Sequence, residues 1–312
     1  MSTNTPMAAP EGILILDKPA GMTSHDCVAK MRRLFQTRKV GHTGTLDPMA
    51  TGVLPILLGR AAKAAEYLVA EDKHYIAGLR LGITTDTEDT TGTTLTECDD
   101  IPEEAEVFAA IRGFVGEIAQ VPPMYSALKV DGQKLCDLAR QGITVERKAR
   151  AITVFSITAE RVDDRNYTLD VRCSKGTYIR TLCADIGAAL GCGGAMSSLR
   201  RAGSGHFTLD AAYTIEALEA MTPEAREALL LPTESLFSEL AEVRLPTFYE
   251  RLADNGQPIS LKKLYRGRFD ASRFPVGARV RIAGENKGFF ALGEICEDAG
   301  DLRVRPVKKF VL

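Results

Sequence analysis

The most informative stretch of this 312-residue chain is Gly41-His42-Thr43-Gly44-Thr45-Leu46-Asp47-Pro48-Met49-Ala50-Thr51-Gly52. Its three glycines allow backbone conformations or close approaches that a side chain would forbid. Pro48 disfavours the helical region for Asp47 and favours an extended conformation there. A single carboxylate is thus held on a stiff, bent loop, which suits a reactive oxygen that must be aimed. An Asp-Pro pair among glycines is also a common turn element, and on spacing alone a structural turn is the better interpretation.

The composition is that of an ordinary globular protein. Hydrophobic residues make up 45% of the chain, enough for a packed core, and the length fits one large domain and a small one. The formal net charge of -2 excludes a globally basic nucleic-acid binder, so any contact with RNA must come from a local patch.

The cysteines give no sign of a disulfide framework, and the histidines give no sign of a metal site. The seven cysteines form no Cys-x-x-Cys pair, and an odd number without a framework indicates reduced thiols and a cytoplasmic protein. The four histidines lie far apart in the sequence and form no recognisable metal-ligand cluster, so no metal is expected. We find no secretory signal and no apolar run long enough to span a bilayer, and we expect no membrane partner.

Hydrophobic periodicity predicts short strands and helices without a regular βαβ alternation. Thr23 or Ser24 can cap a helix whose apolar positions lie between 27 and 35 and whose other face is basic. The expected strands are 13–16, 53–58, 75–81, 152–157 and 167–173, the further helices are 60–69, 102–114 and 179–190, and 84–100 is a loop that could hold a hairpin. This mixture favours the α+β class, with a mixed, largely antiparallel central sheet flanked by helices.

Two regions depart from this core pattern. Residues 117–150 form a mildly basic excursion that could clasp a ligand. From about 243 the chain offers few helical patterns and several strand-like ones, which predicts a small C-terminal β domain. Basic residues with few acids between them gather there: Lys262, Lys263, Arg266, Arg268, Arg273, Arg279, Arg281 and Lys287.

Further segments join the Asp47 loop in a recognisable order. They are Gly12–Pro19, Tyr75, Pro123–Lys129, Cys173–Arg180 and Leu199–Arg201. Together these segments resemble the TruB family of tRNA pseudouridine synthases, whose signature GHxGxLDPxATG the Asp47 loop matches. Residues 1–10 are small, polar and proline-containing, which predicts a disordered tail. The resemblance implies a catalytic domain with the pseudouridine synthase fold at 11–242 and a PUA-like RNA-binding domain at 243–312.

The resemblance assigns the chemistry to three residues. Asp47 is the expected nucleophile, and Arg180, near a helix start, is expected to keep the Asp47 carboxylate charged against the effect of burial. Tyr75 is the expected stacking residue and could take a proton late in the reaction, although an ordinary phenol has a pKa near 10. Without the family, Tyr75 fits a core tyrosine, and Asp47 with Arg180 fits a structural pair.

The same resemblance names four residues that contact the substrate. His42 is expected to fill the space left by a flipped-out uridine or to stack on the displaced nucleotide. Lys18, Tyr178 and Leu199 are expected to line the pocket. Leu199 fits the core nearly as well, and Lys18 fits a surface lysine at a strand end equally well.

The implied activity is the isomerisation of uridine 55 in the T-arm stem-loop of tRNA to pseudouridine, by a cytoplasmic monomer that needs no cofactor or metal. One alternative is a non-catalytic RNA-binding or tRNA-folding protein on the same scaffold. A second is a glycosidase, which would employ two nearby carboxyl groups where the motif offers one. A third is a synthase within a guide-RNA ribonucleoprotein, which the lack of long basic extensions disfavours.

Overall fold

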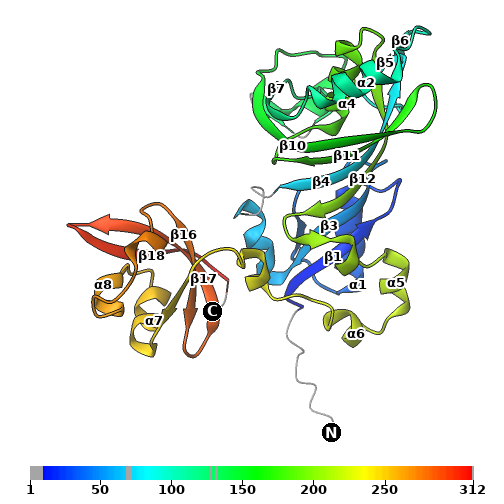
Figure 1. Ribbon diagram of the computed structural model, residues 1–312. Helices are drawn as coiled ribbons and strands as arrows, with labels where there is room; N and C mark the ends of the chain where they lie inside the picture. Colours follow the sequence, from blue (N-terminus) through cyan, green and yellow to red (C-terminus); the bar gives the residue numbers. More distant parts are fainter. Residues whose placement is uncertain (1–9, 68–71, 127, 131, 311–312) are drawn as a thin grey trace.

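The computed structural model describes residues 10–67, 72–126, 128–130 and 132–310 (Figure 1). The predicted tail before residue 10, the end of the predicted helix 60–69, Ala127 and Val311 lie outside these residues. Within them, a nine-stranded sheet forms the centre of the large domain. Its strands in order are β1 (Gly12–Lys18), β3 (Thr51–Leu58), β12 (Gly194–Ser204), β4 (Lys73–Leu81), β11 (Asn166–Cys173), β10 (Arg150–Arg161) and β7 (Gly116–Gln120), with β2 (Val40–His42) beside β3 and β13 (Phe207–Thr208) beside β12.

The sheet is mixed and largely antiparallel, which confirms the predicted fold class. The parallel contact is between β12 and β3, where Arg200 pairs with Thr51 and Arg201 with Gly52, and the other neighbouring strands of this sheet run antiparallel. This contact sets β12 beside the end of the Asp47 loop. A Cβ on Gly52 would lie 2.2 Å from the Arg201 carbonyl oxygen, so only glycine fits there.

Helices pack on the sheet, and the first of them follows from its N-terminal cap and its apolar spacing. In α1 (Ser24–Leu34), Thr23 and Asp26 form a reciprocal capping box, and Cys27, Val28 and Met31 are buried on one face. The other helical segments of the large domain are η1 (Gly59–Tyr67), α2 (Glu104–Arg112), α3 (Leu135–Arg140), α4 (Ile179–Ala189), η2 (Leu209–Ala211), α5 (Ile215–Ala220), α6 (Pro223–Glu227) and η3 (Thr233–Phe237).

Several elements differ from the predicted ones. The helix expected from residue 60 is a 3-10 helix, η1, in which residues three apart share a face, and Ala61 and Ala64 are both buried. The hairpin that the 84–100 loop was expected to allow is confirmed, and it is formed by β5 (Ile83–Thr85) and β6 (Thr94–Glu97). The excursion at 117–150 begins as strand β7 of the central sheet and also holds β8 (Lys129–Val130) and β9 (Gln133–Lys134).

A second, five-stranded sheet forms the C-terminal domain, at the left of Figure 1. Its order is β14 (Glu242–Leu245), β16 (Arg279–Gly284), β17 (Gly288–Asp298), β18 (Asp301–Lys309) and β15 (Ile259–Ser260). The boundary expected between 242 and 243 therefore falls within β14. The sequence pattern missed α7 (Thr247–Asp254) and gave no sign of the short α8 (Leu261–Leu264) and η4 (Ala271–Arg273).

An apolar cluster joins the two domains. Ile13 and Leu57, on β1 and β3, belong to one cluster with Phe237, Leu292 and Phe310. The C-terminal domain thus packs against the β1–β3 end of the central sheet. Among the described helices, none combines the length and the apolarity needed to cross a membrane.

Candidate active site

A cleft of about 1260 Å³ opens in the large domain. Its walls come from the start of α1, the Asp47 loop, strands β4 and β12, the 85–91 loop, the excursion after β7 and the segment leading into α4. Of the seven residues named from the sequence, the cleft is lined by Asp47, Tyr75, Tyr178, Arg180 and Leu199.

The Asp47 loop is held on both sides of the carboxylate. The Ser24 hydroxyl donates to the Leu46 carbonyl and accepts from the Leu46 N–H at 2.9 Å. The Lys18 ammonium donates to the carbonyl oxygens of Pro48 (3.2 Å) and Ala50 (2.6 Å). Asp47 therefore lies between two anchored neighbours, which fix the position of its backbone in the loop.

Lys18 lies beside the Asp47 loop, within reach of its carbonyl oxygens. It is 0% exposed, so it is not a surface lysine at a strand end. It is also not among the described residues that line the cleft. Burial lowers the pKa of its ammonium. The carbonyl oxygens of Pro19, Pro48 and Ala50 accept hydrogen bonds from this ammonium and hold it in place.

Arg180 meets Asp47 inside the cleft. Its Nε lies 3.0 Å from Oδ2 of Asp47, and its Nη2 lies 3.5 Å from Oδ1. Arg180 itself is buried, and its guanidinium also donates to the carbonyl oxygens of Tyr125 (2.7 Å) and Thr87 (3.1 Å). The guanidinium is thus held in one orientation by acceptors from three separate segments.

A second carboxylate, which the motif did not reveal, lies behind this pair. Asp89 Oδ2 is 3.8 Å from Arg180 Nη1, and the side chain is buried. Asp89 Oδ1 accepts from the Thr87 hydroxyl and from the N–H and hydroxyl of Thr91. With one oxygen occupied by threonines and the other facing Arg180, Asp89 is a second anion for the guanidinium.

The charge on Asp47 is a balance of opposing effects. Burial raises the pKa of its carboxyl above the ordinary value, Arg180 opposes this shift, Asp89 adds to it, and Lys18 opposes it. Arg180 opposes the effect of burial, as expected, but burial outweighs it. The ion pair is therefore the main contact that favours the charged, nucleophilic form.

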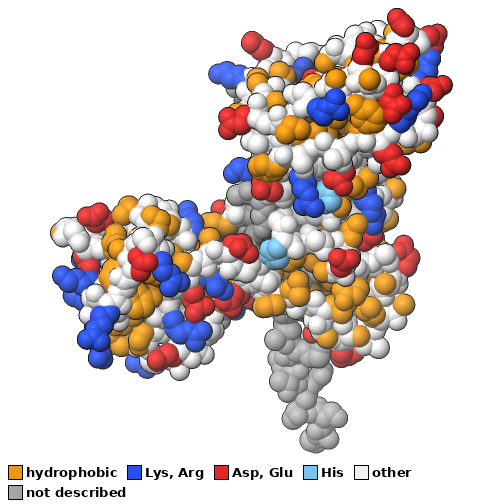
Figure 2. Space-filling model, viewed as in Figure 1, with side chains coloured by type: hydrophobic (Ala, Val, Ile, Leu, Met, Phe, Trp, Pro, Cys, Tyr) orange, Lys and Arg blue, Asp and Glu red, His pale blue; other side chains and the backbone are white. Residues whose placement is uncertain are grey.

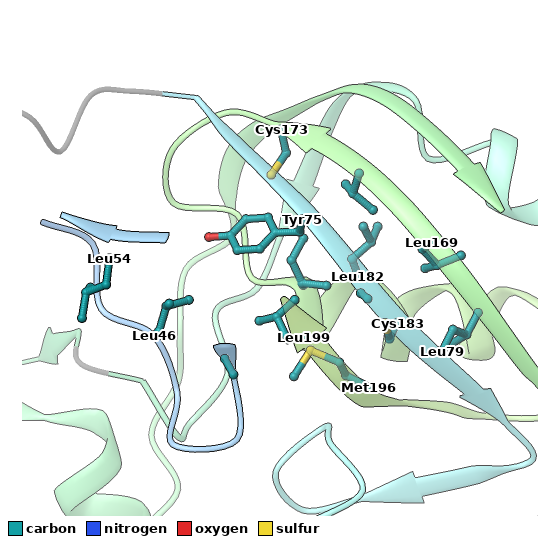
Figure 3. Packing of buried hydrophobic residues seen from close by; sticks show 14 of the residues in the cluster. Leu46, Leu54, Tyr75, Leu79, Leu169, Cys173, Leu182, Cys183, Met196 and Leu199 are labelled. Atoms are coloured by element: carbon teal, nitrogen blue, oxygen red, sulfur yellow. The ribbon is translucent and has the colours of Figure 1, made fainter. Parts of the chain in front are cut away.

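Tyr75 stands on β4 with its ring at the cleft. Figure 3 shows its hydroxyl pointing from the strand toward the side of Leu46 and Leu54, with Leu199 nearby. Burial raises the pKa of the phenol, and Arg201, which is hydrogen-bonded to Tyr75, opposes that shift. Arg201 is itself buried and donates to the carbonyls of Val53 and Gly44. Arg201 thus links strand β3, the Tyr75 side chain and the Asp47 loop.

His42 is partly buried on β2 and lies outside the described lining of the cleft. Its ring meets the ring of His25, which does line the cleft, edge to face at 5.6 Å between centroids. The two histidines that looked distant in sequence are thus neighbours. Burial, with His25 and Arg201 adding to the effect, lowers the pKa of His42 to about 4, so its imidazole is neutral at physiological pH.

The basic residues of the C-terminal domain fall into two groups. Arg279, Arg281 and Lys287 form ion pairs with Glu294, Glu234 and Asp254, so acids distant in sequence neutralise part of the predicted basic stretch. The remaining predicted cations form no ion pair within the described residues: Lys262, Lys263, Arg266, Arg268 and Arg273. All five are exposed, and Figure 2 shows Lys and Arg side chains gathered on the side of this domain where α8 lies.

Comparisons with known proteins agree with this geometry. The family profile described as "TruB family pseudouridylate synthase (N terminal domain)" matches residues 32–179, and "tRNA pseudouridylate synthase B C-terminal domain" matches residues 180–238. A protein named "tRNA pseudouridine synthase B" from Burkholderia mallei (strain NCTC 10247) is 46% identical over 272 residues, which cover 87% of this chain and 89% of that protein. Its namesake from Aromatoleum aromaticum is 44% identical over 292 residues, covering 94% and 91%.

Solved structures share the architecture. A chain in "Crystal Structure of a Cbf5-Nop10-Gar1 Complex" superposes with a TM-score of 0.74 at 27% identity and covers 98% of this chain and 86% of its own. A chain in "Crystal structure of the archaeal box H/ACA sRNP Nop10-Cbf5 complex" gives a TM-score of 0.70 at 25% identity, over 97% and 87%. On the evidence of sequence and fold together, this chain belongs to the TruB family of pseudouridine synthases, which are isomerases.

Proposed function

We propose that this isomerase converts uridine 55 in the T-arm stem-loop of tRNA to pseudouridine, with Asp47 as its nucleophile. The observation that carries the proposal is the ion pair of Asp47 with Arg180, 3.0 Å long, in a cleft of about 1260 Å³. The names of the relatives, "tRNA pseudouridine synthase B", support tRNA as the substrate.

The reaction needs one nucleophile and no change of redox state. The Asp47 carboxylate forms a covalent bond to the substrate, the N1–C1′ bond breaks, and the uracil rotates within the cleft. A C5–C1′ bond then forms, the C5 proton leaves, and the carboxylate is released. Attack at the uracil ring and attack at the ribose carbon are both covalent catalysis by a carboxylate. In either route Arg180 favours the charged form of Asp47 and aims its carboxylate.

Tyr75 and Leu199 are the proposed walls against which the uracil stacks. Because burial raises the pKa of Tyr75, its phenol is protonated at neutral pH. For Tyr75 to take the C5 proton, the phenol must first release its own proton, and Arg201 at the phenol oxygen is the contact that would stabilise that phenolate. Tyr178, which lines the cleft, is proposed to contact the same nucleotide.

The target uridine must leave its stack to reach Asp47. His42, neutral and next to the cleft residue His25, is the proposed side chain that fills the vacated space. RNA-binding proteins recognise such loops through shape, phosphates and splayed bases. The proposed phosphate contacts are the exposed Arg32 and Arg33 of α1, the excursion at about 117–150, and the C-terminal domain at 243–312, which we assign as PUA-like.

We propose that the chain acts as a cytoplasmic monomer on free tRNA. The titles of the structural neighbours describe those proteins in multi-protein complexes. Activity of the purified chain alone on a bare T-arm hairpin would support the monomer, and a requirement for added protein or guide RNA would refute it.

The decisive experiment is incubation of the purified chain with a T-arm hairpin, followed by detection of pseudouridine at single-base resolution. The parent protein should modify the position equivalent to uridine 55, and Asp47→Asn should leave it as uridine while still binding the hairpin. Modification by Asp47→Asn would refute the nucleophile. Binding without modification by the parent would favour a tRNA-folding protein on the same scaffold, and release of free uracil would favour a glycosidase.

A further inference from the structure

Gln120 makes an unusual contact between two distant parts of the chain. It is the last residue of β7 and is 1% exposed. The Tyr178 N–H donates to its Oε1 at 2.7 Å, and its Nε2 donates to the Tyr178 carbonyl oxygen at 3.0 Å. The side-chain amide thus pairs with both polar groups of one backbone residue, as a neighbouring strand would do.

Tyr178 is the residue at which the chain enters α4. Serine, threonine, aspartate and asparagine are preferred at this N-cap position because their side chains bond the first helical N–H groups. Tyr178 makes no such side-chain bond, and its backbone is extended, with φ -100° and ψ 109°. The start of α4 is therefore fixed by an amide from β7 rather than by a cap of its own.

The segment that follows Gln120 also contacts Arg180, which lies in the first turn of α4. Tyr125 accepts from Arg180 Nη2 at 2.7 Å, and Pro122 and Pro123 stiffen the chain between Gln120 and Tyr125. Arg147 Nη1 donates to the Pro122 carbonyl oxygen at 3.0 Å and anchors that stretch. One short segment therefore holds the Tyr178 backbone at one end and the Arg180 guanidinium at the other.

We infer that Gln120 is a positioning residue for the isomerisation: its carboxamide sets the first turn of α4 so that the Arg180 guanidinium meets Asp47. This inference rests on the proposed role of Asp47 as nucleophile. It predicts an effect on the chemical step rather than on RNA binding, because Gln120 is buried and is not among the described residues that line the cleft.

The first test compares Gln120→Leu with the parent in single-turnover reactions at saturating T-arm hairpin. A displacement of about 1 Å at a reacting centre can cost on the order of 10²-fold, so we expect the rate to fall by roughly 10- to 100-fold. The dissociation constant for the hairpin should stay near that of the parent. Gln141→Leu, which changes an exposed glutamine of the same excursion, is the matched control and should keep the parent rate.

The second test uses Gln120→Glu, which keeps the shape of the side chain. A protonated carboxyl can accept from the Tyr178 N–H and donate to the Tyr178 carbonyl, whereas an ionised one can only accept. The ratio of the variant rate to the parent rate should therefore rise as the pH falls. The titration of Asp47 is present in both proteins, so the ratio reports on the new carboxyl.

The outcomes separate the inference from the function on which it rests. A folded Gln120→Leu with the parent rate, or with a loss confined to hairpin binding, overturns the positioning role. If Gln120→Leu does not fold, a ratio for Gln120→Glu that is the same at all pH values overturns it. An active Asp47→Asn in the same assay refutes the proposed nucleophile instead, whereas an inactive one beside an unimpaired Gln120→Leu refutes the inference alone.

Discussion

Arg180 Nε lies 3.0 Å from Asp47 Oδ2, although the two residues are 133 positions apart in the sequence. The same guanidinium donates to the carbonyl oxygens of Tyr125 and Thr87. A lysine could supply the charge but not a planar fork that reaches all of these acceptors. The orientation of the charge, as well as its presence, is thus built into the site.

Arg180→Lys should lower the single-turnover rate by about 10²-fold, because the carboxylate loses its aimed partner. Arg180→Met should also move the acidic limb of the pH–rate profile to higher pH, since Arg180 is what opposes the burial-induced rise in the pKa of Asp47. Both effects are read from single-turnover rates on a T-arm hairpin between pH 4 and 8. Arg172→Lys, an exchange at an exposed strand position, is the control. An unmoved acidic limb in Arg180→Met would contradict this account.

Asp47→Asn should abolish activity without lowering the stability of the fold at neutral pH. Burial raises the pKa of Asp47 in the folded state above its unfolded value of about 3.9, so the folded protein favours the protonated form. The charged carboxylate therefore costs stability that grows as the pH rises above about 3.9 and is complete once the pH exceeds the folded pKa.

The melting temperature of Asp47→Asn relative to the parent should accordingly rise between pH 4 and pH 7. Asp72→Asn, which changes an exposed carboxylate, should show no such trend. A variant that loses stability relative to the parent as the pH rises would mean that the ion pair with Arg180 outweighs burial.

Lys18→Met tests whether Lys18 supports the loop or contacts the nucleotide. The change leaves the buried carbonyl of Ala50 without its donor, which typically costs about 1–3 kcal/mol of unfolding free energy. We expect that loss in urea unfolding, a lower single-turnover rate, and an unchanged affinity for the hairpin. Lys63→Met, at an exposed lysine, should change none of these. A stable Lys18→Met with weakened RNA binding would return Lys18 to the substrate contacts.

The sequence allowed the prediction of those features that depend on short, local patterns. The strands around Tyr75 and Val53 follow from apolar runs, and α1 follows from its cap and its apolar spacing. The Asp47–Arg180 contact could be expected because each residue stands in a specific motif. The arrangement of the strands that line the cleft depends on their register, which local patterns do not reveal. In β12 the register shifts on either side of Leu199.

Residues without a distinctive local pattern could not be predicted. Asp89 stands in an acidic, threonine-rich loop that resembles any solvated loop, and only the fold brings it to Arg180. Gln120 is a single polar residue at a strand end, and its partner lies 58 positions away. The acids that neutralise Arg279 and Arg281 likewise come from other elements, so a count of nearby charges overestimated the basic surface.

The division of the C-terminal cations into paired and unpaired groups predicts which of them meet RNA. Lys263 and Arg268 form no ion pair within the described residues and are exposed, so they can neutralise phosphates without first losing a partner. Arg279 and Lys287 are already paired with Glu294 and Asp254. A phosphate would have to compete with a carboxylate for these two, which reduces what they can contribute to binding.

Lys263→Gln and Arg268→Gln should each weaken binding to full-length tRNA and reduce the slope of log K against log salt by about 0.7 to 0.9. Arg279→Gln and Lys287→Gln should reduce it by less. Dissociation constants for tRNA at several salt concentrations, measured in the Asp47→Asn background to prevent turnover, give the slopes directly. The bare T-arm hairpin is the companion substrate, because an effect seen with tRNA but not with the hairpin places the contact outside the T-arm. Equal slope changes for all four variants would show that ion pairing within the protein does not select the phosphate contacts.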